Sequence, residues 1–215
     1  MVESTLIYRY DALPLCGSID DDDTNTQLLD QKKKCKLLIS RITPNSEQQA
    51  TIESGNYNIH YLIKNQIIYL TITTKSYPRK LAFSYLVEIS NEFDNSFGSD
   101  ALSSQARPFG FSSFDNFLQK TKKIYSDQRA QSNLDKLNTD LQDVKKVMTK
   151  NIEDLLYRGD SLDKMSNLSY NLKQDSLKYK RRAQRINFEA MIRQYAPIIG
   201  CGLIFVAMIY YLFKR

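Results

Sequence analysis

Two hydrophobic patterns divide the chain. Over roughly the first third, apolar and polar positions alternate in short stretches, which is typical of β-strands. The alternation predicts strands at 5–10, 13–18, 50–54, 57–64 and 67–74, with one helical interval at 24–42.

Two further helices are predicted after these strands. Pro78 suits the first turn of a helix whose apolar residues recur at helical spacing, and Gly98 is expected to end it. Ser112 or Ser113 caps the next helix, and Ser112 and Asp115 have the spacing of a capping box. This order predicts an α+β fold: a five-stranded, mostly antiparallel sheet covered by helices.

A different period begins further along the chain. Core-type residues there step by three and four without a slip, which averages 3.5 residues per step and predicts a coiled-coil seam. The seam positions are Leu134, Leu137, Leu141, Val144, Met148, Asn151, Leu155, Arg158, Leu162, Met165, Ser169, Leu172, Ser176, Tyr179, Ala183 and Ile186. A continuous helix over this span would be about 80 Å long. Because it has one narrow apolar edge, we expect it to become helical only when partner helices cover that edge.

Arg158 is the one charge in the seam. A guanidinium keeps its charge and carries N–H donors that need acceptors once water is excluded, so a buried Arg158 requires oxygens from partner helices. A single polar residue in an apolar seam would also fix the register. Arg158 could instead be a surface arginine whose stem covers part of the seam. The regular steps favour the seam position.

A hydrophobic tail follows. Residues 194–213 carry no charge, and this segment is long enough to cross a bilayer core of about 30 Å as one helix. Basic residues gather before the tail, at Lys178, Lys180, Arg181, Arg182, Arg185 and Arg193, and only Lys214 and Arg215 follow it. This asymmetry predicts a single-pass, tail-anchored protein with a cytosolic N-terminus. The basic cluster either only enforces this orientation or also attracts anionic lipid headgroups, whereas nucleic-acid binding is not expected.

The composition does not indicate a catalytic or ligand-binding site. The chain has 215 residues, formal net charge +6, one histidine and seven glycines. We find no phosphate-cradling glycine loop and no compelling pair of carboxylates, so we expect neither an enzyme nor a cofactor or metal site. Cys16, Cys35 and Cys201 have no clustered spacing, and we expect no disulfide. His60 is expected to have a packing or solvated role.

Several strings carry a family resemblance. They are Asp11-Ala12-Leu13-Pro14-Leu15, Tyr77-Pro78-Arg79-Lys80-Leu81-Ala82-Phe83-Ser84-Tyr85-Leu86, Arg107-Pro108-Phe109 and Phe114-Asp115-Asn116-Phe117-Leu118-Gln119-Lys120-Thr121-Lys122-Lys123. With the seam centred on Arg158 and the hydrophobic tail, the whole chain resembles a longin-type R-SNARE of the Sec-twenty-two type.

The resemblance implies a profilin-like longin domain at 1–126, a SNARE motif with its basic juxtamembrane segment at 127–189, and a transmembrane anchor at 190–215. It also implies that Arg158 forms the central ionic layer of a four-helix bundle with three Q-SNARE helices, syntaxin-type and others. Zippering from Leu134 toward Ile186 would drive fusion of ER–Golgi transport vesicles, and a separate ATP-driven machine would disassemble the bundle. The implied location is the endoplasmic reticulum, the Golgi and transport vesicles.

Asn151, Ile152 and Glu153 resemble a short segment that, in this family, folds back on the longin domain. The resulting closed form is read by the vesicle coat of ER export. Since Asn151 is also a seam position, coat binding and zippering would compete. The rival interpretation is a tail-anchored tether or coat or cargo receptor whose seam forms a static dimer.

Overall fold

The computed structural model describes residues 1–18, 26–43, 45–126 and 147–156. Eleven elements follow one another along these residues: β1 (Val2–Arg9), β2 (Pro14–Gly17), α1 (Thr26–Ile39), β3 (Gln49–Ser54), β4 (Tyr57–Lys64), β5 (Ile67–Thr74), α2 (Arg79–Leu102), the 3₁₀ turn η1 (Ser112–Phe114), α3 (Asp115–Ser126), β6 (Met148–Asn151) and α5 (Ile152–Leu156). The five strands predicted from alternation are all present.

The sheet has six strands in the order β2-β1-β5-β4-β3-β6, so the prediction of a five-stranded sheet is wrong. The first five strands pair antiparallel, whereas β6 pairs parallel with β3. The additional strand comes from a segment whose apolar spacing is helical. Its pairing with β3 joins residues almost a hundred positions apart. Hydrophobic periodicity and turn residues are local signals, so they do not predict which distant strand will pair.

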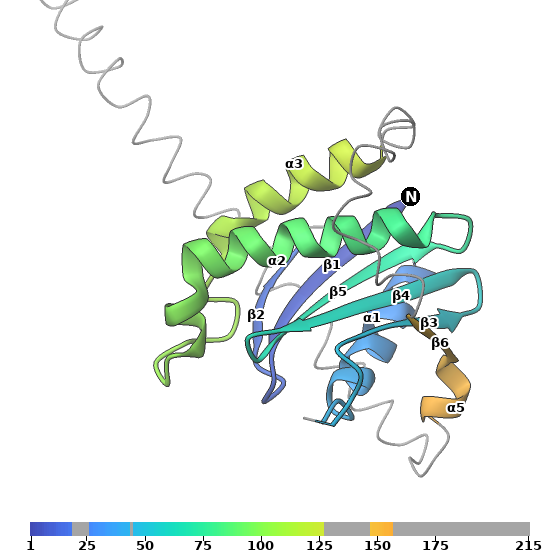
Figure 1. Ribbon diagram of the computed structural model, residues 1–215, viewed down its shortest axis with the longest axis horizontal. Helices are drawn as coiled ribbons and strands as arrows, with labels where there is room; N and C mark the ends of the chain where they lie inside the picture. Colours follow the sequence, from blue (N-terminus) through green and yellow to red (C-terminus); the bar gives the residue numbers. More distant parts are fainter. Residues whose placement is uncertain (19–25, 44, 127–146, 157–215) are drawn as a thin grey trace, which may run out of the picture.

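Helices cover both faces of the sheet (Figure 1). On one face, α1 packs against β3, β4 and β5 through Leu38, Ile39, Ile52 and Ile59. On the other face, α2 and α3 pack against β1, β2 and β5. The two apolar clusters explain why β5 is buried over nearly its whole length.

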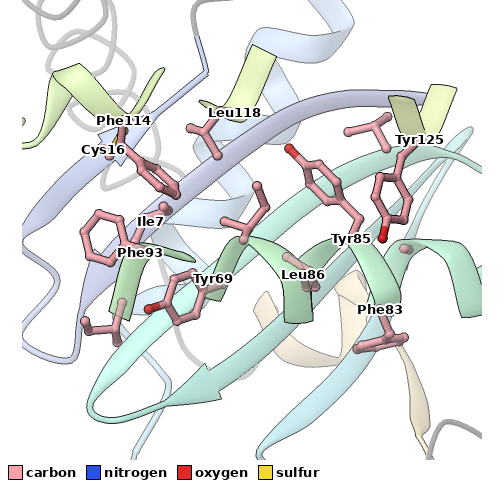
Figure 2. Packing of buried hydrophobic residues seen from close by; sticks show 14 of the residues in the cluster. Ile7, Cys16, Tyr69, Phe83, Tyr85, Leu86, Phe93, Phe114, Leu118 and Tyr125 are labelled. Atoms are coloured by element: carbon pink, nitrogen blue, oxygen red, sulfur yellow. The ribbon is translucent and has the colours of Figure 1, made fainter. Parts of the chain in front are cut away.

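The core beneath α2 and α3 contains a network of aromatic rings among aliphatic side chains (Figure 2). Phe93 of α2 meets Phe114 edge-on with a centroid distance of 5.1 Å, and it meets Tyr69 of β5 edge-on at 6.1 Å. Tyr85 packs edge-on against Tyr125 at 5.5 Å. Such edge-to-face pairs stabilise beyond their buried area, so they fix α3 onto α2.

His60 lies in the sheet on the α2 side and has a packing role. Its Nδ1 is 2.9 Å from the hydroxyl of Thr51, its Nε2 is 3.1 Å from that of Thr73, and its ring lies edge-on to Phe83. Burial holds the pKa of His60 down at about 3, and the charge of Arg79 contributes. The ring is therefore neutral at physiological pH, with one nitrogen donating and the other accepting.

Further segments of the chain pair with both β2 and β3. At the β2 edge, the N–H of Phe109 donates to the carbonyl of Pro14 at 2.8 Å, and that of Phe111 donates to Leu15. Phe109 has a φ of 54°, a left-handed conformation that turns the chain back along the strand. On the opposite side of the sheet, β6 pairs with β3 and is itself the edge strand. An uncovered edge strand is a template for pairing with another chain.

Two further expectations differ from the structure. Gly98 does not end α2, which continues to Leu102, since this glycine has no positive φ. Ser112 begins η1 rather than α3.

Cys16 and Cys35 are both buried and free. No helix among the described residues is long and apolar enough to cross a membrane. The predicted anchor at 190–215 and Cys201 lie outside the described residues.

Candidate intramolecular docking site

Residues 147–156 lie on the edge of the sheet although twenty positions without a described structure separate them from α3. In the parallel pair, Met148 is opposite Ala50, Thr149 opposite Thr51, Lys150 opposite Ile52 and Asn151 opposite Glu53. The chain then turns into α5, which packs against α1 and β3. Figure 1 shows β6 and α5 at the β3 side of the domain.

Two apolar anchors hold this segment, one on each face of the sheet. Val147 is 7% exposed and belongs to the core beneath α2 and α3. Ile152 is 4% exposed and belongs to the core beneath α1. They are five positions apart and flank the strand Met148–Asn151, whose alternation directs their side chains to opposite faces. A one-residue slip in register would turn both away from their cores.

Polar contacts add to the anchors. The ammonium of Lys150 is 2.7 Å from the Oε2 of Glu47, just before β3, and this bond lowers the pKa of Glu47. Both side chains are over one-third exposed, so we expect the pair to contribute less than about 1 kcal/mol. Arg41, which follows α1, donates from Nη1 to the carbonyl of Leu155. That bond satisfies one of the carbonyls left open at the end of a short helix.

Asn151 marks the change from strand to helix. Its Oδ1 accepts the backbone N–H of Glu153 at 3.0 Å, which is the bond that an N-cap residue makes. Glu153 and Asp154 lie in the first turn of α5, where carboxylates suit the helix dipole. Both are exposed and available to a partner.

Three of the predicted seam residues lie among the described residues: Met148, Asn151 and Leu155. They do not form one face of a helix here, because the first two are in β6 and the third is in α5. Met148 is 55% exposed, whereas Leu155 packs against the α1-side core. The others lie outside the described residues: Leu134, Leu137, Leu141, Val144, Arg158, Leu162, Met165, Ser169, Leu172, Ser176, Tyr179, Ala183, Ile186 and the basic residues Lys180, Arg181, Arg182, Arg185 and Arg193.

Four residues of this site were missed by sequence reasoning: Val147, Lys150, Glu47 and Arg41. One sequence signal could have indicated the docked strand. Val147 and Ile152 are β-branched, an odd number of positions apart, and outside the predicted seam. Nothing local identifies Glu47 or Arg41, since each becomes part of the site only when β6 pairs with β3.

Comparison with known proteins agrees with this architecture. Residues 15–118 match the family model Longin, described as a regulated-SNARE-like domain, and residues 133–213 match the model Synaptobrevin. The chain is 56% identical over its full length to the protein transport protein SEC22 of Eremothecium gossypii, with all of both chains covered. The chain belongs to the Sec22 family.

Other relatives extend the same match. The protein transport protein SEC22 of Saccharomyces cerevisiae is 52% identical, with all of both chains covered. The 25.3 kDa vesicle transport protein SEC22-1 of Arabidopsis thaliana is 39% identical, with 96% of each chain covered. Sec22 family proteins act in trafficking rather than as enzymes, and the SNARE motif implies SNARE partners. Within the described part of this chain, no three His, Cys, Asp or Glu residues gather as metal ligands would.

Proposed function

We propose that the chain is a vesicle R-SNARE whose residues 147–156 alternate between the sheet edge and a four-helix bundle. The observation that carries this proposal is that Met148, Asn151 and Leu155 belong both to the docked segment and to the predicted seam. One backbone cannot be strand at Met148–Asn151 and helix over the same residues. Docking and zippering therefore exclude each other.

The bundle would bury more apolar side chains than docking does. Val147 and Ile152 are the two deeply buried anchors of the docked form, and burying them contributes about 3–6 kcal/mol gross. On the same scale, ten aliphatic or methionine seam positions contribute roughly 15–30 kcal/mol gross. We expect docking to delay zippering rather than prevent it, because the bundle buries more apolar residues, and in the docked chain β3 is paired with β6 and is not open to foreign strands.

In the assembled state, Arg158 would lie in the central layer and meet glutamine oxygens from three Q-SNARE helices. Zippering from Leu134 toward Ile186 would pull the anchor at 190–215 and the opposing bilayer together. The proposed domain boundaries are the predicted ones, 1–126, 127–189 and 190–215. The proposed setting is ER–Golgi transport, with the N-terminus cytosolic and disassembly by an ATP-driven machine.

The docked form is also the proposed ligand of the ER export coat. Exposed Glu153 lies beside Asn151 on α5, where a coat subunit could contact residues of both the domain and the SNARE motif. A coat that binds this composite surface would package only molecules that are not assembled in a SNARE bundle. A static dimeric tether would instead hold Met148 and Asn151 permanently in a helix, and their place in β6 argues against it.

Lipid mixing tests the proposal. The full chain is placed in donor vesicles, and glutamine-bearing partners are placed in acceptor vesicles. We expect mixing that requires all partners, and we expect Arg158→Leu to disturb bundle register or recycling. Stable homodimers with no lipid mixing would contradict the fusion role and favour the tether.

A further inference from the structure

Cations from two separate parts of the chain meet at one end of the domain. The hydroxyl of Tyr77 donates to the carbonyl of Tyr125 at 2.8 Å, so the start of α2 lies against the end of α3. Figure 1 shows both helix ends beside the N-terminus. Lys75 and Arg79 flank Tyr77, and Lys120 and Lys123 precede Tyr125. We name these four residues the basic end.

All four side chains of the basic end are exposed. Among the described residues, no ion pair or hydrogen bond engages the side chain of Lys75, Lys120 or Lys123. Two carboxylate residues lie nearby. Glu88 accepts a hydrogen bond from the hydroxyl of Tyr125, and Glu3 is placed there by the bond that the Lys122 ammonium donates to its backbone carbonyl. The basic end therefore keeps an excess of positive charge.

An exposed apolar residue lies among these cations. Ile124 is 60% exposed, the highest exposure of any large hydrophobic side chain among the described residues. Lys120, Lys123 and Ile124 are related by steps of three and four, so they share the outer side of α3. The inner side, with Leu118, Thr121 and Tyr125, is buried. α3 thus has one side in the core and an outer side that combines charge with an apolar residue.

We propose that the basic end binds an anionic lipid surface, with Ile124 entering the headgroup region. Basic residues around an apolar side chain are the combination that suits such a surface. The hydrophobic tail predicted at 194–213 would keep the domain close to a bilayer. This site is separate from the basic cluster before the tail and does not depend on zippering, so it goes beyond the proposed function.

The absence of tryptophan from the sequence allows a direct test. Ile124→Trp introduces a single tryptophan at the basic end, and Leu102→Trp introduces one at the far end of α2. Leu102 is a matched control because it is also an exposed apolar residue, at 40%. Each full-length variant is incorporated into vesicles containing lipids brominated near the headgroup. Emission and quenching are then compared between neutral and anionic compositions.

We expect the tryptophan at position 124 to shift to shorter wavelength and to be quenched only in anionic vesicles. About 1 M salt should reverse the effect, since it shortens the screening length to about 3 Å. Adding Lys120→Gln and Lys123→Gln should reduce the bound-to-free ratio about 25-fold, at about fivefold per cation. The tryptophan at position 102 should remain solvent-exposed.

Three outcomes would overturn the proposal. The first is solvent-like emission at position 124 in every vesicle. The second is equal quenching at 124 and 102, which would report only tethering. The third is a response to soluble polyglutamate without a response to anionic vesicles, which would assign the basic end to an acidic protein. Circular dichroism and the melting temperature of each variant check that the fold is retained.

Discussion

Replacing Ile152 by alanine should separate docking from zippering. Ile152 is 4% exposed in the docked form but does not occupy a seam position, so its truncation removes an anchor of the closed state only. Truncating a buried isoleucine costs about 2–5 kcal/mol in a complete core. Because α5 lies at the edge of the domain and can relax, we use the lower end, about 2 kcal/mol. That corresponds to an increase of about 30-fold in the open-to-docked ratio.

Hydrogen exchange on the full chain measures this ratio. Backbone amides of Gln49–Ser54 and Met148–Asn151 that are protected by the β3–β6 pairing should exchange faster in Ile152→Ala, while those of β5 should not. Assembly with glutamine-bearing helices should also become faster, because less of the chain is closed.

Met148→Ala is the matched control with the opposite expectation. Met148 is 55% exposed in the docked form and is a predicted seam position, so its truncation should change docking by less than about 0.5 kcal/mol while weakening the bundle. If Ile152→Ala leaves exchange at β3 unchanged, or if Met148→Ala opens the edge equally, the two-anchor account is refuted.

Three further predictions concern the domain and its docked segment. Glu47→Gln should weaken docking by less than about 1 kcal/mol at pH 7. Since Lys150 lowers the pKa of Glu47, the pair's contribution in the wild type should be lost only as the pH falls through that lowered pKa, which exchange profiles at several pH values can measure. Because His60 is neutral when folded, with a pKa of about 3, and takes a proton when unfolded, its presence should reduce stability as the pH falls below about 6.5, by up to about 1.4 kcal/mol per pH unit. Melting curves should therefore show a weaker pH dependence in His60→Gln between pH 6.5 and 4, and an unchanged slope would contradict this. Phe93→Ala, in the ring cluster beneath α2, should lower the free energy of unfolding by about 3–5 kcal/mol in urea titrations, whereas the exposed Leu102→Ala should change it little.

Local patterns predicted most of the sheet and its helices. Alternation in β4 correctly placed Ile59 and Tyr61 on one face and His60 on the other, because a period of two is a property of the strand itself. Alternation does not predict whether a helix packs on the face of the sheet that carries His60. His60 is therefore fully buried, although its polar neighbours in sequence, Asn58 and Lys64, also allowed a solvated role.

The docking site was predictable only in part. The family resemblance pointed to Asn151, Ile152 and Glu153, but neither the strand nor its parallel pairing with β3 follows from the sequence. The seam period describes the proposed assembled state, whereas Val147 and Ile152 are buried in the docked state, and the two sets of residues overlap along the same chain. A single hydrophobic periodicity cannot predict two alternative structures of the same segment.

The most direct test of the account is the distance between the sheet edge and the segment, before and after partners are added. Spin labels at Glu53→Cys and Glu153→Cys, in a full-length chain carrying Cys201→Ser, use two exposed positions, while Cys16 and Cys35 are buried. We predict a short, narrow distance distribution in the chain alone, since Glu53 is opposite Asn151 in the pairing. It should become long when glutamine-bearing helices assemble. A distance that stays short in the assembled bundle would show that the segment does not leave β3, and it would contradict the proposed exclusion of docking by zippering.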